Sequence, residues 1–220
     1  MQRELEPEVM ADAAEAVAYD AMDHSGPNQA FVERLVELGA AGHMLDIGTG
    51  PGHIPLLVCE AIDGCHVTGV DLSAEMLAIA QRRRDASAFA DRIVYRVADA
   101  KGLPFPDGRF DTVFSNTILH HLVDPRTLLA EAWRVLRPGG VLLIRDLFRP
   151  ADQRTLDDLV RTYAGEESID QRKLFRDSLK AALSVDELRA IADELGLSDV
   201  SVVVDTDRHM SLQTACKASS

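Results

Sequence analysis

The stretch LDIGTGPGH at residues 45–53 decides the fold, because a short apolar run ends there in three closely spaced glycines. Residues 43–48 predict a buried strand, and a helix is expected to begin near His53. Gly48 and Gly50 have no Cβ, so a ligand can approach the backbone, and the amides that open the helix favour an anionic group. The stretch therefore predicts a strand–turn–helix unit that binds a ligand.

The glycine spacing separates the classes of ligand. A dinucleotide fingerprint reads G-x-G-x-x-G, but here the third glycine comes one place early, at Gly52, and His53 stands in the expected position. The pattern G-x-x-x-x-G-K-[ST] is absent from the sequence, which excludes a P-loop. A nicotinamide-dependent dehydrogenase stays an alternative, although His53 argues against it.

The same alternation of strand, turn and helix continues on both sides of this unit. Short β-rich runs lie at 65–71, 92–98, 110–115 and 141–144, and helices are expected at 27–38, after Ser73, after Asp124-Pro125 and after Ser184. This order predicts crossover connections and a parallel sheet. Two further strands, 199–204 and 209–216, predict an antiparallel hairpin at its edge. Residues 148–182 fit no strand and predict one or two inserted helices that form a lid.

Composition narrows the function. A length of 220 residues suits one domain, and a formal net charge of −13 argues against a nucleic-acid substrate. No stretch reaches the roughly 18–20 apolar residues of a membrane span, and the N-terminus lacks the apolar core of a signal peptide. The three cysteines have no metal-ligand spacing, and their odd number favours a reducing compartment. We therefore expect a cytoplasmic protein without a metal site.

Three aspartates follow or end predicted strands and favour a nucleoside ligand. Asp71 ends the second strand, where a carboxylate can accept both ribose hydroxyls. Asp99 follows the third strand and suits an adenine amino group, although it can equally start the turn at 99–102. Asp46 precedes the glycine turn and can orient the loop or meet an ammonium group.

At this point the chain resembles the class I S-adenosylmethionine-dependent methyltransferases, particularly the small-molecule group similar to ubiquinone/menaquinone biosynthesis methyltransferases. The resemblance rests on LDIGTGPG (45–52), VDLS (70–73), VADA (97–100), FDTVFSN (110–116) and RVLRPGG (134–140). It implies an α/β, Rossmann-like seven-stranded sheet of order 3-2-1-4-5-7-6, with strand 7 antiparallel, helices on both faces and a small helical lid. The expected organisation is a single domain over residues 1–220, with an N-terminal helical segment at 1–40 and the lid at 148–182.

The resemblance also implies an enzyme that uses S-adenosyl-L-methionine and moves its methyl group by in-line displacement. The residues expected to bind this cofactor are Tyr19, Asp46, Gly48, Thr49, Gly50, Asp71, Leu72, Met76, Asp99, Ala100 and Asn116. His120 and His121 are the candidates for a general base, because imidazole titrates near working pH. Arg145, Asp146 and Tyr163 are the candidates for acceptor binding.

A small-molecule acceptor is favoured because residues 115–118 read SNTI, where family members that methylate bases or protein glutamine usually carry [DNS]-P-P-[YF]. Two other functions stay open: a non-catalytic module that binds the cofactor, and a protein-directed methyltransferase. A homodimer also stays open.

Overall fold

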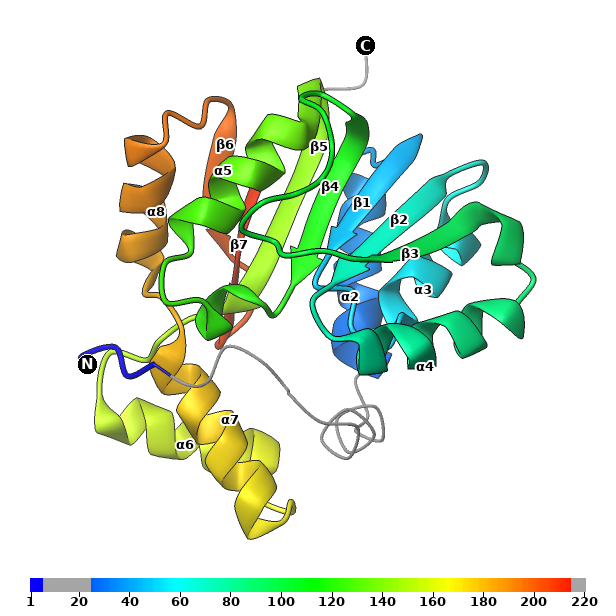
Figure 1. Cartoon of the computed structure of the whole chain (residues 1–220). Coiled ribbons are helices and arrows are strands. Elements are labelled where there is room, and N and C mark those ends of the chain that lie inside the picture. The colour runs from blue at the N-terminus through cyan, green and yellow to red at the C-terminus, as the bar shows by residue number, and fades with distance from the viewer. Residues whose placement is uncertain (6–24, 215–220) are drawn as a thin grey trace.

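The computed structural model describes residues 1–5 and 25–214, and its centre is a seven-stranded sheet of order β3-β2-β1-β4-β5-β7-β6 (Figure 1). The strands are β1 (His43–Ile47), β2 (His66–Asp71), β3 (Ile93–Val97), β4 (Phe110–Asn116), β5 (Leu136–Leu147), β6 (Val200–Val204) and β7 (His209–Thr214). Strands β1 to β5 are parallel, whereas β7 is antiparallel to both β5 and β6. The predicted fold class and strand order are confirmed.

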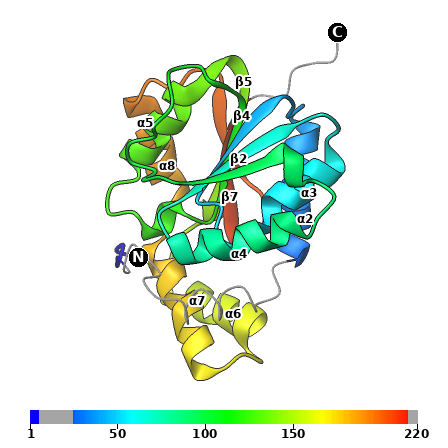
Figure 2. The ribbon, with the colours of Figure 1, turned by 45° about the vertical axis from the view of Figure 1, so that its right-hand side comes forward.

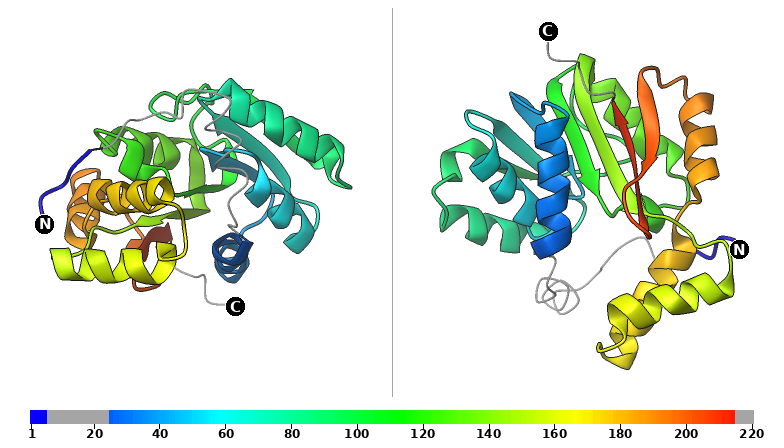
Figure 3. Two further views of the ribbon diagram at one scale, coloured as in Figure 1. Left: turned by 90° about the horizontal axis from the view of Figure 1, so that it is seen from below. Right: turned by 180° about the vertical axis from the view of Figure 1, so that it is seen from behind.

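Helices cover both faces of the sheet, as the views in Figure 3 show. They are α2 (Ser25–Glu37), α3 (His53–Ala61), α4 (Ala74–Asp85), α5 (Arg126–Val135), α6 (Gln153–Ala164), α7 (Ile169–Ala181) and α8 (Val185–Glu194), with short 3₁₀ turns η1 (Ala90–Arg92) and η2 (Leu119–His121). One buried cluster joins α2, α3 and α4 to one face, and another joins α5 and α8 to the opposite face. None of the helices described is long and apolar enough to cross a bilayer.

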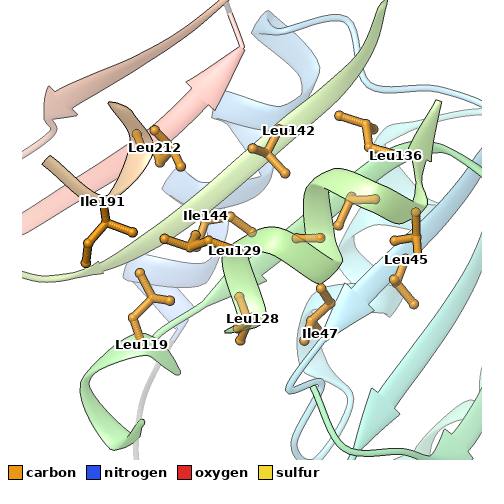
Figure 4. Packing of buried hydrophobic residues seen from close by; sticks show 14 of the residues in the cluster. Leu45, Ile47, Leu119, Leu128, Leu129, Leu136, Leu142, Ile144, Ile191 and Leu212 are labelled. Atoms are coloured by element: carbon orange, nitrogen blue, oxygen red, sulfur yellow. The ribbon is translucent and has the colours of Figure 1, made fainter. Parts of the chain in front are cut away.

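The buried cluster beneath α5 and α8 packs against strands β1, β4 and β5 and holds them in place. Figure 4 shows Leu45 and Ile47 of β1 beside Leu128 and Leu129 of α5, and all four side chains are at most 1% exposed. Burial of one such side chain contributes about 1.5–3 kcal/mol. The carboxyl end of β1, where the glycine turn begins, is therefore anchored to a rigid core.

Two predicted boundaries differ from the structure. A strand was expected at 141–144, but β5 already begins at Leu136 and pairs there with Phe110. Asp124 was expected to cap a helix whose first residue is proline. The helix instead starts at Arg126, whose amide donates to Asp124 Oδ1 at 3.0 Å, and Pro125 occupies the capping position.

Residues 148–182 form two helices, α6 and α7, which pack on each other beside the edge where the parallel strands end (Figure 2). Arg149 holds the base of this α6–α7 pair. Its guanidinium donates to the Ala182 carbonyl oxygen at 2.7 Å and to Glu187 Oε1 at 2.7 Å, and to the Met1 carbonyl oxygen at 3.0 Å. The segments that precede α6 and follow α7 are thereby tied to each other and to α8.

Candidate functional site

Two adjoining pockets lie at the carboxyl ends of β1, β2 and β4, where open α/β sheets bind ligands. The small pocket, with a volume of about 150 Å³, is lined by Gly48, Gly50, Val70, Asp71, Leu72, Ser73, Met76, Ala98, Asp99, Ala100, Lys101, Asn116, Thr117, Ile118, His121 and Leu122. The large pocket, of about 500 Å³, opens beside it under the α6–α7 pair. Five residues line both: Gly48, Gly50, Asn116, Thr117 and His121.

The glycine turn has a left-handed backbone at all three glycines, with φ of 72°, 53° and 78° at Gly48, Gly50 and Gly52. A side chain at Gly50 would meet no atom within 4 Å, whereas one at Gly52 would come within 2.5 Å of the Tyr95 hydroxyl and 2.8 Å of Ala80 Cβ. Gly50 therefore leaves the pockets open, and Gly52 lets α3 and α4 pack closely.

Asp71 ties the turn to the start of α4. Its Oδ2 accepts from the Gly50 amide at 2.8 Å, and its Oδ1 accepts from the Ser73 amide at 2.9 Å. Ser73 in turn caps α4, because its hydroxyl accepts from the Met76 amide at 3.2 Å. Burial raises the pKa of Asp71, against the lowering effect of these amides. A carboxylate has about four lone-pair sites, so Asp71 keeps capacity to accept from a ligand in the small pocket.

Asp46 lies beneath the turn and lines neither pocket. It is 1% exposed, and its Oδ2 accepts from the Thr49 hydroxyl at 2.7 Å. Burial raises the pKa of Asp46 to about 7. The structure thus supports a role in orienting the loop, because the Asp46 carboxylate contacts the turn and lines neither pocket.

The far wall of the small pocket comes from α4 and from the loop after β3. Leu72 is 49% exposed and Met76 is 5% exposed, and both face the pocket. Asp99 and Ala100 also line the pocket, and Asp99 Oδ1 accepts from the Lys101 amide at 2.9 Å. Asp99 therefore starts the predicted turn and lines the pocket at the same time.

A buried histidine–aspartate pair lies at the boundary of the large pocket. His120 Nδ1 is 2.6 Å from Asp146 Oδ1, and the His120 amide donates to Asp146 Oδ2 at 3.0 Å. Burial opposes ionisation of Asp146, but the neighbouring His120 outweighs it, so the net effect lowers the pKa of this carboxyl. An ionised carboxylate only accepts, so Nδ1 of His120 carries the hydrogen and Nε2 is the basic nitrogen.

The segment that joins β4 to this pair is strained. Thr117 has a φ of 60°, a conformation rare for a β-branched residue, and its amide donates to the Arg145 carbonyl oxygen at 2.8 Å. The bend carries the chain from Asn116 into η2, where the rings of His120 and His121 lie 4.1 Å apart between centroids. The result is that Asn116 and His121 line both pockets, and His120 lines the large one.

The outer wall of the large pocket combines β5, β7 and the α6–α7 pair. Arg145 and His209 are 6% and 7% exposed, and both line the pocket. Tyr163 of α6 donates to Asp207 Oδ2 at 2.7 Å, and the Arg208 guanidinium lies 3.4 Å from the centre of the Tyr163 ring. These contacts join the α6–α7 pair to the β6–β7 turn across the pocket mouth.

Comparison with known proteins identifies the family. A model described as "Methyltransferase domain" matches residues 45–144. The 27-O-demethylrifamycin SV methyltransferase of Amycolatopsis mediterranei is 34% identical over 168 residues, which cover 76% of this chain and 58% of that protein. The phosphoethanolamine N-methyltransferase 2 of Haemonchus contortus, in complex with S-adenosyl-L-methionine, has a TM-score of 0.68 at 26% identity, covering 89% of this chain and 44% of that one. The chain belongs to the class I S-adenosylmethionine-dependent methyltransferases.

The methyltransferase fold extends over nearly the whole chain. A protein of Methanococcus maripaludis has a TM-score of 0.74 at 19% identity and covers 98% of this chain and 99% of its own, a likeness that shows the fold. The chain spans less than two thirds of the length of the rifamycin relative.

The structure brings together most of the residues predicted for a methyltransferase site. Gly48, Gly50, Asp71, Leu72, Met76, Asp99, Ala100 and Asn116 line the small pocket, and Thr49, His120, Arg145 and Tyr163 line the large one. Asp146, expected to touch the acceptor, lies behind His120 instead and lines neither pocket. Tyr19 falls outside the described residues. Among the described residues, no group of three or more His, Cys, Asp or Glu side chains is placed to hold a metal ion.

Sequence reasoning missed Arg208 and His209, which line the large pocket. The signal was present in the predicted topology. Because β7 is antiparallel to β5, its first residue pairs with the last residue of β5, and His209 lies opposite Leu147. The turn before β7 is thereby brought to the edge where the parallel strands end.

Proposed function

We propose that this chain transfers a methyl group from S-adenosylmethionine to a small-molecule acceptor, with the cofactor in the small pocket and the acceptor in the large one. The observation that carries the proposal is the junction of the two pockets at the glycine turn and the end of β4. A donor and an acceptor bound on the two sides of this junction are held in contact, which is most of what a displacement reaction needs. The large pocket's volume of about 500 Å³ suits a small molecule.

The side chains of the small pocket offer carboxylate acceptors and apolar surface that suit the hydroxyls, the amino group and the ring of the cofactor. We assign the ribose hydroxyls to Asp71, the adenine to Leu72, Met76, Asp99 and Ala100, and the methionine end to the glycine turn. The open space beside Gly50 supports the assignment of the methionine end. A Cβ at this position would meet no atom within 4 Å, so the turn leaves room there for a ligand. When bound, S-adenosylmethionine supplies an electrophilic methyl group on a sulfonium whose thioether leaving group needs no further activation.

His120 is the base in this proposal. The carboxylate of Asp146 holds the imidazole by its protonated Nδ1, and Nε2 is the nitrogen that takes a proton from the acceptor. The two backbone amides that bind Asp146, those of His120 and Leu147, hold the pair in one orientation. This arrangement matters for a hydroxyl or ammonium acceptor, because such a group must lose a proton to react.

The α6–α7 pair acts as a lid over the acceptor. It contributes Tyr163, Leu174 and Phe175 to the large pocket, so it covers the acceptor with apolar surface and excludes water.

We also propose a cytoplasmic location, supported by Cys59 and Cys65, which are free although their sulfurs lie 3.9 Å apart. Titration of the thiols in denatured protein that was purified without reductant tests the reduced state. The chain has three cysteines, so one free thiol would mean that two of them form a disulfide, which would contradict the proposed location.

The first experiment is calorimetric titration with S-adenosylhomocysteine, with NADH in parallel. One-site binding of S-adenosylhomocysteine alone supports the cofactor assignment, and binding of NADH alone would overturn it. An acceptor screen with methyl-labelled S-adenosylmethionine then follows by mass spectrometry. Once an acceptor is found, Asp146→Asn and His120→Ala are expected to lower kcat about 10²–10⁴-fold. His43→Ala, exposed at the opposite edge of the sheet, is the matched control.

Failure of both variants to slow turnover would remove the base from the mechanism while leaving the cofactor site intact. Binding of S-adenosylhomocysteine without turnover of any acceptor would instead favour the non-catalytic module.

A further inference from the structure

Arg145 has a position in the large pocket that its structural contacts do not explain. It lies near the end of β5, in register with Asn116 on β4 and Ser211 on β7, and it is 6% exposed. Side chains at paired positions of neighbouring strands lie on the same face of a sheet. The guanidinium therefore shares a face with Asn116, one strand away from the junction of the two pockets.

The guanidinium is buried without being satisfied. Its Nε has no hydrogen-bond partner in the described structure, and its Nη1 reaches the Pro27 carbonyl oxygen only at 3.4 Å. The nearest carboxylate oxygen, Asp205 Oδ2, is 3.8 Å from Nε, which is an ion-pair distance but too long for a hydrogen bond. An arginine cannot become neutral to relieve this burial, so the site retains a buried charge with an unused donor.

The neighbouring groups do not neutralise this charge fully. Burial raises the pKa of Asp205, whose other oxygen accepts from the Ser211 hydroxyl at 3.1 Å. Burial, followed by the charges of Arg145 and Arg208, lowers the pKa of His209 to about 3, so this histidine stays neutral and adds no positive charge of its own.

The lining of the large pocket favours a negative ligand. Among its described residues it contains two arginines, Arg145 and Arg208, and a single acid, Glu167. Glu167 lies exposed at the turn between α6 and α7, where water solvates it. Arg208 already contacts Asp207 and the Tyr163 ring. Arg145 is thus the buried cation of this pocket whose donor is left for a ligand.

We propose that Arg145 forms an anion subsite: the methyl acceptor carries a carboxylate or phosphate group that the Arg145 guanidinium binds. This inference rests on the proposed function, because it assigns the large pocket to the acceptor. Neighbouring strands are about 4.8 Å apart, so one to two strand spacings, about 5–10 Å, separate the anionic group from the reacting atom. The substrate class is therefore a small acid in which roughly one ring or a short chain connects the two groups.

The test uses the protein saturated with S-adenosylhomocysteine and three probes that share a ring: benzoate, phenyl phosphate and the neutral benzyl alcohol. Calorimetry or ligand-observed NMR measures their dissociation constants. At least one of the anions is expected to bind tenfold or more tightly than benzyl alcohol, and the preferred anion distinguishes a carboxylate from a phosphate. If S-adenosylhomocysteine binds but neither anion binds more tightly than benzyl alcohol, the proposed subsite is wrong. If S-adenosylhomocysteine itself does not bind, the proposed function fails first.

Variants separate the subsite from a structural role. Arg145→Met is expected to weaken the preferred anion at least tenfold and to leave benzyl alcohol unchanged. Arg145→Lys keeps the buried charge and serves if the methionine variant does not fold. Its affinity for the preferred anion is expected to fall several-fold. Asp205→Asn is expected to strengthen the anion several-fold, because it removes the competing carboxylate, and a fall or no change would contradict the subsite. Arg161→Met, on the exposed face of α6, is the matched control.

Discussion

Alanine at Gly50 and at Gly52 separates the pocket function of the glycine turn from its packing function. Both residues have positive φ, 53° and 78°, so either substitution places a Cβ in the left-handed region at a cost of about 1–2 kcal/mol. Only the alanine at 52 also clashes, at 2.5 Å with the Tyr95 hydroxyl and at 3.1 Å with Ala80 Cα. Such overpacking adds about 1–3 kcal/mol.

These energies convert into measurable shifts. A loss of 1 kcal/mol lowers the melting temperature of a chain of this size by about 2–4 °C. We therefore expect Gly50→Ala to melt about 2–8 °C below the wild type, and Gly52→Ala about 4–20 °C below it. Thermal unfolding monitored by circular dichroism checks both values, and because the two variants share the backbone penalty, their difference isolates the clash.

The two variants are expected to rank in the opposite order for ligand binding, with Gly50→Ala the more strongly affected. The methyl group at position 50 enters the space that both pockets share, so the affinity for S-adenosylhomocysteine should fall at least tenfold, about 1.4 kcal/mol. The alanine at 52 points into the packing between α3 and α4, and folded protein should bind within about threefold of the wild type. The reasoning is refuted if Gly50→Ala binds normally, or if Gly52→Ala is the more stable variant of the two.

Three further predictions concern Asp71, Asp46 and Tyr163. Asp71→Asn should weaken S-adenosylhomocysteine about 10–100-fold in calorimetry, because charge-assisted hydrogen bonds contribute about 1.5–3 kcal/mol each; unchanged affinity would contradict the ribose assignment. The folded pKa of Asp46, about 7 through burial, lies above its ordinary value of 3.8, so the contribution of Asp46 to the free energy of unfolding should be highest below pH 4 and should fall as pH rises to 7. The full effect is roughly 4 kcal/mol, and urea unfolding should show that Asp46→Asn loses this dependence. Tyr163→Phe removes the hydrogen bond to Asp207 but keeps the ring under Arg208. Amide hydrogen exchange in α6 and α7 should therefore become faster, while the melting temperature changes by less than about 2 °C. Exchange at the wild-type rate would show that this contact does not hold the lid.

The sequence was informative about the cofactor side of the site because local chemistry determines it. A strand that ends in Gly48, Gly50 and Gly52 must turn sharply, and a capping serine at 73 must start a helix, whatever lies elsewhere in the chain. Asp71 follows from the same logic, since it ends a strand beside that turn. The turn and the helix start needed only residues within a few positions of one another, whereas the place of Asp71 also needed the parallel pairing of two neighbouring strands.

The acceptor side could be predicted less well because tertiary contacts determine it. Asp146 and Arg145 are adjacent in sequence, and alternation along β5 places them on opposite faces, but the alternation does not say which face meets His120. Nothing local indicated that His120 and Asp146, 26 residues apart, form a pair. The lid was recognised by the absence of strand pattern, and its contact with the β6–β7 turn depends on a side-chain bond between Tyr163 and Asp207.

The two sides of the site also differ in how firmly they are held, and this difference has a functional consequence. Backbone hydrogen bonds fix the glycine turn to β2, with the Gly48 and Thr49 amides 2.8 and 2.9 Å from the Val70 carbonyl oxygen. The lid is held across the pocket by the exposed side chain of Tyr163, which contacts Asp207 and the partly buried Arg208, and such contacts near the surface are weak in water. Opening of the lid therefore costs little and leaves the cofactor pocket undisturbed. In the proposed function, an acceptor can enter and a methylated product can leave by this opening without distortion of the glycine turn, and S-adenosylhomocysteine then exchanges for a new cofactor molecule.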